Sequence, residues 1–260
     1  MHFHKSILLL LLFISPSSLL AQSNSPVQAI PEPSCPICAE WNAPQHPFQI
    51  YGNTYYVGPR GLAAILVTSV EGHVLIDGGL PESAPLIADN IRALDFRVDD
   101  IRMILNSHAH FDHAGGIASL QRITGAEVAA SPASRSILLR GESGPDDPQF
   151  GELPSFPAAE NVRELTNGEI IRVGPLELTA HFTPGHTPGG TTWSWQSCEE
   201  DRCLNLVYAD SQTPASAGGF KFTRNDFYPS VIADLRRGHE ILESLSCDIL
   251  VTTHPGASRL

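Results

Sequence analysis

Residues 108–113 are His108-Ala109-His110-Phe111-Asp112-His113, a run that places four potential metal ligands within six positions. Imidazole and carboxylate groups suit zinc and also accept other divalent metals. The run follows the apolar stretch 102–105, which we expect to be a short buried strand. In an extended loop His108 and His110 point to the same side, and a turn at Phe111 directs Asp112 and His113 towards a second position. The run therefore predicts a metal centre at a strand end.

The spacing of these ligands favours two adjacent metals over one. A single metal rarely takes four ligands from six consecutive residues, because the chain cannot wrap so tightly around it. Two distant histidines can complete the sites: His186 lies in a Pro/Gly loop after a predicted strand, and His254 follows the last predicted strand. Three ligands per metal leave positions open for water, which is typical of a catalytic zinc site. The alternative, a set of solvated surface histidines, fits poorly with four ligands spaced so closely after an apolar strand.

Hydrophobic patterning along the rest of the chain predicts short strands and amphipathic helices. Strands are expected at 55–57, 63–70, 73–77, 102–105, 127–130, 191–195, 204–208 and 248–252, with three more within 162–182. Helices are expected at 81–94, 115–124, 133–140 and 230–245. The order shows no strict βαβ alternation and no glycine-rich phosphate loop. It favours an α+β fold, an αβ/βα sandwich of two mixed sheets packed face to face with helices outside.

The N-terminal residues are typical of an export signal, with an apolar run over 7–14 and a cleavage point after Ala21. The alternative is an uncleaved membrane anchor, although the run is too short and broken for a comfortable membrane span. We expect a signal peptide at 1–21, a flexible lead-in at 22–47 and a catalytic domain at 48–260. These features predict a periplasmic or secreted protein without stable membrane association after cleavage, and we also expect it to be a monomer. The formal net charge of −12 argues against nucleic acid as a partner.

The chain has five cysteines, and export permits disulfides between them. Cys198 and Cys203 flank a turn between two strand-like runs, so a hairpin would join them in a disulfide. Cys35 and Cys38 form a C-x-x-C pair, which often indicates redox or zinc chemistry. Their place in a Pro-rich lead-in instead favours a local disulfide or two unrelated thiols. The odd number leaves at least one cysteine without a partner.

A His-X-His-X-Asp-His run on a loop after a strand is the signature of the metallo-β-lactamase superfamily, which residues 48–256 resemble. Asp77, in Leu75-Ile76-Asp77-Gly78-Gly79, resembles the first motif of that family, whose acid supports the metal loop. Alternatively, Asp77 is a turn residue that caps a helix. Within the family the chain is most similar to class B, subclass 3 β-lactamases. That likeness rests on the stretches 51–58, 107–116, 183–192 and 207–211.

The resemblance implies two zinc ions per chain and a particular ligand set. The first metal would be bound by His108, His110 and His186, and the second by Asp112, His113 and His254. Ser211 stands where other β-lactamase subclasses place a cysteine ligand, so its hydroxyl is expected to bind substrate or water. Thr213 is a second, less specific candidate for substrate contact. The irregular segment 141–160 matches the flexible segment that borders the substrate cleft.

The implied chemistry is hydrolysis of the β-lactam amide bond of penicillins, cephalosporins and carbapenems. A hydroxide held between two zinc ions is a nucleophile at neutral pH, because metals lower the pKa of bound water to ~7. Asp112 would orient that hydroxide as well as bind metal. The first metal would stabilise the oxyanion, and the second the departing ring nitrogen. Ser211 is not expected to act as a nucleophile, because the sequence offers no adjacent base.

Two other functions fit parts of the same pattern. A thioesterase or lactonase of the same fold, similar to glyoxalase II, uses an aspartate that bridges both metals. Asp210 would take that role if the register were shifted by one residue. Export and the stretch 208–211 followed by Pro214 favour the lactamase. The other alternative is a non-catalytic binding protein, which would have no need of six ligands.

The resemblance also sets an expectation for the C-terminal end. Relatives in this subclass continue past the last histidine with a helical segment, often bearing a cysteine that pairs near the position of Cys247. This sequence stops six residues after His254. We therefore expect Cys247 to lack that partner, His254 to be held less firmly, and the protein to gain thermal stability if the segment is added.

Overall fold

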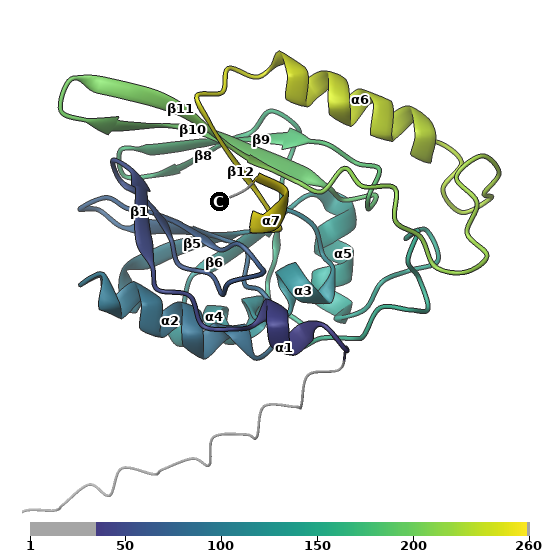
Figure 1. Ribbon diagram of the computed structural model, residues 1–260, viewed down its shortest axis with the longest axis horizontal. Coiled ribbons are helices and arrows are strands. Elements are labelled where there is room, and N and C mark those ends of the chain that lie inside the picture. Colours follow the sequence, from purple (N-terminus) through teal and green to yellow (C-terminus); the bar gives the residue numbers. More distant parts are fainter. Residues whose placement is uncertain (1–34, 259–260) are drawn as a thin grey trace, which may run out of the picture.

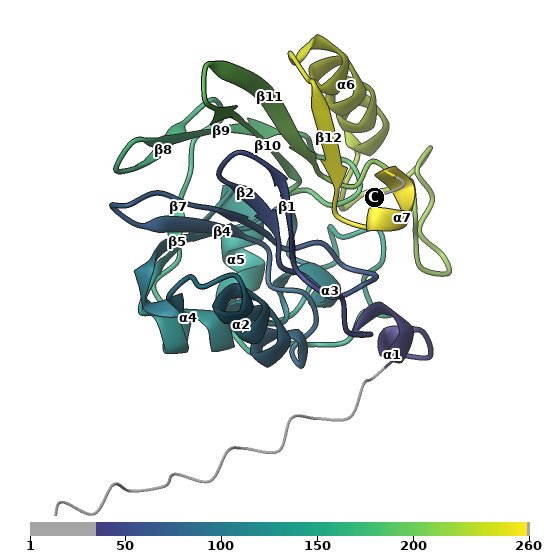
Figure 2. The same cartoon turned by 60° about the vertical axis from the view of Figure 1, so that its left-hand side comes forward.

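The computed structural model describes residues 35–258, and it confirms the predicted sandwich of two mixed β-sheets packed face to face (Figures 1 and 2). The first sheet has the strand order β1-β2-β3-β4-β5-β6-β7 and the second the order β12-β11-β10-β9-β8. In the first sheet the pairs from β4 to β7 are parallel and the others antiparallel. In the second sheet only β11 and β12 are parallel.

The strands of the first sheet are β1 (Phe48–Tyr51), β2 (Thr54–Tyr56), β3 (Ile65–Val67), β4 (His73–Ile76), β5 (Ile101–Leu105), β6 (Glu127–Ala130) and β7 (Arg163–Glu164). Those of the second are β8 (Ile170–Val173), β9 (Leu176–Phe182), β10 (Thr191–Glu199), β11 (Arg202–Ala209) and β12 (Ile249–Thr252). The helices are α1 (Cys38–Trp41), α2 (Ser83–Ala93), the 3₁₀ helix η1 (Val98–Asp100), α3 (Phe111–Ala114), α4 (Ile117–Thr124), α5 (Pro132–Arg140), α6 (Val231–Ser244) and α7 (Pro255–Ser258).

Two hydrophobic cores hold these layers together, one on each face of the first sheet. Leu66 and Leu75 pack with Ile87 and Ile91 of α2 in the outer core. The alternate residues of the strands, such as Ile65, face the second sheet in the inner core. All four residues of β4 are buried because helices cover one face and a sheet the other. Figure 1 shows α2 and α4 on one side of the sandwich and α6 on the opposite side.

Most of the predicted elements are present, with differences where the pattern was short. The strand β1 was not predicted, and residues 111–114 form the single-turn helix α3 within the metal loop. The predicted signal peptide lies outside the described residues. The lead-in is described from Cys35 onwards, where it forms α1 and buries Cys38 against the outer core. The domain boundaries stay predictions. Among residues 35–258 no helix is long and apolar enough to cross a membrane.

The structure contains the disulfide expected at Cys198–Cys203 and a local disulfide at Cys35–Cys38. The first joins β10 to β11 at a directly paired position of their ladder. Cys247 is exposed and is the one free thiol of the described residues.

Thiol counting checks this assignment. We expect one thiol per native chain to react with an aromatic disulfide reagent, and five after reduction and unfolding, because four of the five cysteines are paired. Burial and then Asp248 raise the pKa of Cys247, so less thiolate is present at pH 8 and its reaction should be slower than that of a free cysteine. A Cys247→Ala variant should give no native signal. Three reactive thiols in the native wild type would disprove the pairing.

Candidate metal centre

The candidate ligands meet because the strands that carry them end at the same edge of the sandwich. The strand β5 ends at Leu105, and His108 and His110 follow on the connecting loop. At Phe111 the backbone turns into α3, with His110 still extended at φ −84° and ψ 155°. This turn brings Asp112 and His113 beside the two preceding histidines, with the rings of His108 and His113 4.4 Å apart between centroids. The loop between β9 and β10 brings His186, and the end of β12 brings His254.

The first group consists of the rings of His108, His110 and His186. The distances between their ring centroids are 4.7, 4.9 and 5.0 Å. One nitrogen of each ring already has a protein partner. Nδ1 of His108 lies 2.7 Å from Asp210 Oδ1, Nε2 of His110 lies 2.9 Å from Asp147 Oδ2, and Nδ1 of His186 lies 2.8 Å from the carbonyl oxygen of Thr213. Such partners fix the tautomer and the ring orientation of metal-binding histidines.

The remaining nitrogens of the first group suit a cation. One potential ligand atom from each ring lies within 4.8 Å of the other two. Within the described part of the chain, the buried Nε2 of His108 has no hydrogen-bond partner. A buried polar atom without a partner is unfavourable by about 1–3 kcal/mol. A metal between the three rings would provide the missing partner.

The second group consists of Asp112, His113 and His254. Asp112 Oδ2 lies 3.2 Å from His113 Nε2 and 3.5 Å from His254 Nε2, and the two nitrogens are 3.2 Å apart. Ligand atoms of a tetrahedral zinc ion, each at about 2.0–2.1 Å from the metal, are separated by about 3.3 Å. The triangle therefore has the dimensions of one face of a zinc site. Because His108 also lies within 4.8 Å of Asp112 and His113, the two groups adjoin.

Burial and neighbouring charges keep most of these groups in the form that binds metal. Burial and then His110 lower the pKa of His186 to about 4. Burial and then His113 hold the pKa of His108 well below its usual value, so both rings are neutral at pH 7. Burial alone would raise the pKa of Asp112, but His113 and its other neighbours outweigh burial and keep Asp112 ionised. Metal ligands must be deprotonated, so these shifts favour binding.

Asp77 lies directly beneath the metal loop. Its Oδ1 accepts hydrogen bonds from the Ser107 amide at 2.7 Å and from Asn106 Nδ2 at 3.1 Å. Its Oδ2 accepts them from Ser107 Oγ at 2.6 Å and from the Tyr208 hydroxyl at 2.8 Å. The side chain is fully buried and the residue has a φ of 63°. These bonds connect β4 to the start of the metal loop, and none of them goes to α2.

His254 is held by residues from the N-terminal part of the chain. Its Nδ1 lies 3.3 Å from the carbonyl oxygen of Gly61, and the Trp41 ring packs at 5.2 Å between centroids. The side chain of His254 is still 35% exposed, against 1% for His113. The second group is therefore the more open of the two.

The two predicted substrate-contact residues lie beside the ligands. Ser211 Oγ is 2.8 Å from Thr253 Oγ1, next to His254. Thr213 contacts His186 through its carbonyl oxygen. The hydroxyl of Ser211 is thus paired with the hydroxyl of Thr253, and the expectation that Ser211 is not a nucleophile stays a prediction.

Three residues of the site were not assigned their structural roles from sequence. Asp147, Asp210 and Trp41 contact His110, His108 and His254 respectively. Asp210 was considered only as a metal-bridging residue of the alternative function. Asp147 falls within the segment 141–160, and the length and composition of that segment were the only sequence features that indicated a functional role there. Nothing in the lead-in indicated Trp41.

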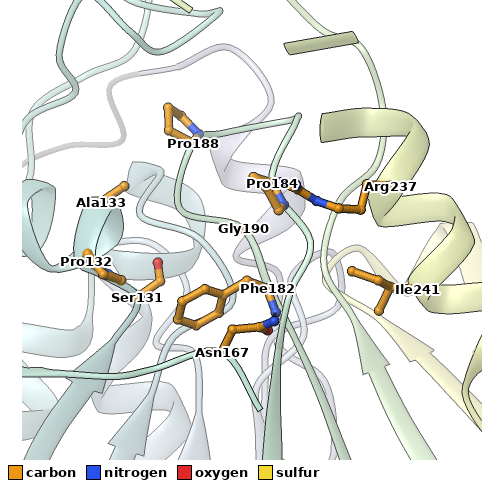
Figure 3. Close-up of a pocket in the computed structure, with 10 residues that line it drawn as sticks. All are labelled: Ser131, Pro132, Ala133, Asn167, Phe182, Pro184, Pro188, Gly190, Arg237 and Ile241. Carbon is orange, nitrogen blue, oxygen red and sulfur yellow. Dashed lines mark hydrogen bonds between the residues drawn. The ribbon is translucent and has the colours of Figure 1, made fainter. Parts of the chain in front are cut away.

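A pocket of about 480 Å³ lies beside the His186 loop, between the start of α5 and the helix α6 (Figure 3). Pro184, Pro188 and Gly190 of the loop line it, together with Arg237 and Ile241 of α6. None of the six candidate ligands lines it, so this pocket is separate from the metal centre.

Close packing around Gly190 predicts that a side chain at this position would destabilise the fold. A Cβ there would collide with the Asp210 carboxylate, which holds His108, and with the carbonyl oxygen of Thr183. We expect Gly190→Ala to cost about 1–3 kcal/mol of unfolding free energy, seen as a Tm lower by roughly 2–10 °C in thermal unfolding. Gly218→Ala is the matched control, since its Cβ would meet only Glu152 Oε1 at 3.7 Å. Equal Tm values for the two variants would refute the close approach.

Comparison with known proteins identifies the family. The family model described as the metallo-beta-lactamase superfamily matches residues 57–198, which is more than half of the 260 residues. The chain belongs to the metallo-β-lactamase superfamily.

Solved structures narrow the likeness to one branch of that family. The chain is 58% identical to the Rm3 metallo-beta-lactamase, with 88% of this chain and 85% of that one covered and a TM-score of 0.86. It is 48% identical to MEM-A1, a subclass B3 metallo-beta-lactamase from a soil metagenome library, with 84% and 82% covered and a TM-score of 0.83. The resemblance to subclass B3 that the sequence indicated is thereby confirmed.

Curated relatives match over shorter stretches. The chain is 33% identical over 89 residues to the hydroxyacylglutathione hydrolase of Maricaulis maris, covering 34% of this chain and 27% of that protein. The chain spans between about a quarter and three fifths of the length of the first curated relatives it matches.

Proposed function

We propose that the protein hydrolyses the amide bond of β-lactam antibiotics, namely penicillins, cephalosporins and carbapenems. The observation that carries the proposal is the convergence of six ligand side chains in two adjoining groups, with a serine beside the second group. This ligand set has no cysteine, and it occurs in a chain 48–58% identical to metallo-β-lactamases.

We further propose two zinc ions per chain. The first is bound by His108, His110 and His186, and the second by Asp112, His113 and His254. When bound, zinc supplies Lewis acidity and a water acidic enough to act as a nucleophile near neutral pH.

The protein residues have distinct parts in this scheme. Asp112 would both bind metal and orient the attacking water through its carboxylate. Asp77 keeps the metal loop in place from below. Ser211 and Thr213, which lie beside the ligands, would contact the substrate, and the segment 141–160 would border the cleft. The side chain of His254 is 35% exposed, so the second group is accessible from solvent.

The proposal includes an exported monomer with a signal peptide at 1–21. Two disulfides agree with an oxidising compartment, so the enzyme would act in the periplasm or outside the cell. Its substrates are small molecules, and the net charge of −12 disfavours nucleic acid.

The position of Asp210 favours a lactamase over a thioesterase or lactonase of the glyoxalase-II type. Its side chain is fully buried, and its Oδ1 is used by His108 Nδ1 at 2.7 Å. A bridging aspartate would instead lie between the two ligand groups. Asp210 therefore supports His108 from the side opposite Nε2, the nitrogen available for metal.

A substrate comparison tests the proposal. Purified, zinc-supplemented protein is assayed with a penicillin, a carbapenem, a glutathione thioester and a homoserine lactone. We expect ring opening of both β-lactams, followed by their ultraviolet absorbance, and no cleavage of the other two. Cleavage of the thioester or lactone with both β-lactams left intact would overturn the proposal in favour of the alternative hydrolase. Zinc binding without any hydrolysis would favour a binding protein.

A further inference from the structure

Two ligands of the first group are connected to each other through a second route, outside the metal centre. His110 Nε2 is bonded to Asp147, and His186 Nδ1 to the carbonyl oxygen of Thr213. Asp147 and Thr213 belong to two loops, 144–152 and 213–218, which we term the paired loops. The loops are bonded to each other, because the Ala217 amide donates to the Pro148 carbonyl oxygen at 2.8 Å.

A second bond reinforces this pairing on the outer side. The Gly218 amide donates to Glu152 Oε1 at 2.8 Å. The structure therefore contains a continuous path from His110 to His186. Hydrogen bonds join His110 to Asp147, Ala217 to Pro148 and His186 to Thr213, and the backbone supplies the short links from Asp147 to Pro148 and from Thr213 to Ala217.

Asp147 is the residue on which this path depends. Its side chain is fully buried, and Oδ2 lies 2.9 Å from His110 Nε2. Its Oδ1 accepts a hydrogen bond from the Gln149 amide at 2.8 Å, and its backbone bonds to Gly144 and Phe150 within the same loop. A single carboxylate thus fixes both the conformation of loop 144–152 and the orientation of a metal-binding ring.

The path has one gap, between the free nitrogens of His110 and His186. A metal bound by both rings would close the gap and turn the path into a ring. Metal binding by the two histidines would then favour order in the paired loops. The coupling is reciprocal, so ordered loops must strengthen metal binding to the same extent.

We propose that Asp147 is a positioning residue that couples metal binding at His110 and His186 to the order of the paired loops. The inference rests on the first metal group of the proposed function and deepens it. Metal loading then increases the order of loop 144–152, which would border the substrate cleft, as well as supplying the reaction chemistry.

The test uses the full chain in metal-free and zinc-loaded forms. Backbone hydrogen exchange is followed by mass spectrometry, and zinc affinity is measured by competition with a chromophoric chelator. For the wild type we expect zinc to slow exchange of peptides covering 144–152 and 213–218, with little change in β3 and β4. For Asp147→Asn we expect zinc affinity to fall about 10–100-fold, the usual effect of losing such a partner. In that variant, at saturating zinc, the paired loops should exchange as fast as in the metal-free protein.

Asp146→Asn is the matched control, because it makes the same change of charge at the neighbouring residue without contacting His110. It should keep wild-type affinity and wild-type loop protection.

Wild-type affinity and protection in Asp147→Asn would overturn the proposal. If Asp147→Asn fails to fold, the wild type decides alone, since unchanged loop exchange on zinc loading also overturns it. A wild type that shows loop protection but leaves β-lactams intact would contradict only the proposed function. A wild type that hydrolyses β-lactams but shows no loop protection on zinc loading would contradict only the coupling.

Discussion

Replacing Asp112 with asparagine is expected to lower kcat/KM for a carbapenem by about 10³-fold or more. The carboxylate lies within 3.2–3.5 Å of His113 and His254, and its pKa is held well below the usual range, so the group is ionised at pH 7. The amide removes a negative charge beside the two proposed metal sites and would weaken the orientation of water. A loss of about 4 kcal/mol of transition-state stabilisation corresponds to about 10³-fold in rate.

Initial rates and zinc content, measured on the same preparations, check this expectation. The matched control is Asp201→Asn, which makes the same change in the exposed turn between β10 and β11 and should leave both quantities unchanged. An Asp112→Asn enzyme within about tenfold of wild type at saturating zinc would mean that Asp112 neither binds metal nor orients the nucleophile.

The largest effect on stability is expected at Asp77. Truncation to alanine removes the acceptor of four hydrogen bonds at a fully buried position, from Ser107 (two), Asn106 and Tyr208. Each buried donor left without a partner costs about 1–3 kcal/mol, and partial relaxation leaves an expected total of about 3–5 kcal/mol. For a domain of this size the Tm should fall by roughly 10 °C.

Asp77→Asn separates the hydrogen bonds from simple side-chain volume. Asparagine retains one acceptor oxygen and tolerates the left-handed backbone at φ 63°. We therefore expect a fall in Tm about half that of Asp77→Ala, measured by calorimetry on zinc-free protein so that metal loss does not contribute. An alanine variant as stable as wild type would show that the bonds beneath the metal loop contribute nothing to the fold.

The sequence predicted the fold well because its sheets are buried on definite faces. Successive residues of β3 face opposite sides of the sheet, so Ile65 and Leu66 lie in opposite cores, and this pattern can be recognised in the sequence alone. The strand β1 was missed because its four residues are half-buried or exposed, so their hydrophobic pattern carries no signal. The helix α3 was missed because one turn is too short to show a helical period.

Of the candidate site, the sequence could supply the ligands but not the residues that orient them. Four ligands are local in the chain, whereas Asp147 is 37 residues from His110 and Asp210 is 102 residues from His108. Only the packing of loops at one edge of the sandwich creates these pairs. For the same reason nothing in the lead-in indicated that Trp41 would pack against a ligand more than 200 residues away.

The two adjoining metal groups are expected to act together in the hydrolysis of a β-lactam. The most direct test of this expectation is to strip the protein with a chelator, restore zinc stepwise, and record zinc per chain and carbapenem hydrolysis on the same samples. We expect no hydrolysis by the metal-free protein and a rise in rate that reaches its maximum at two zinc ions per chain. Full hydrolysis by metal-free protein, or none with two zinc ions bound, would contradict the account.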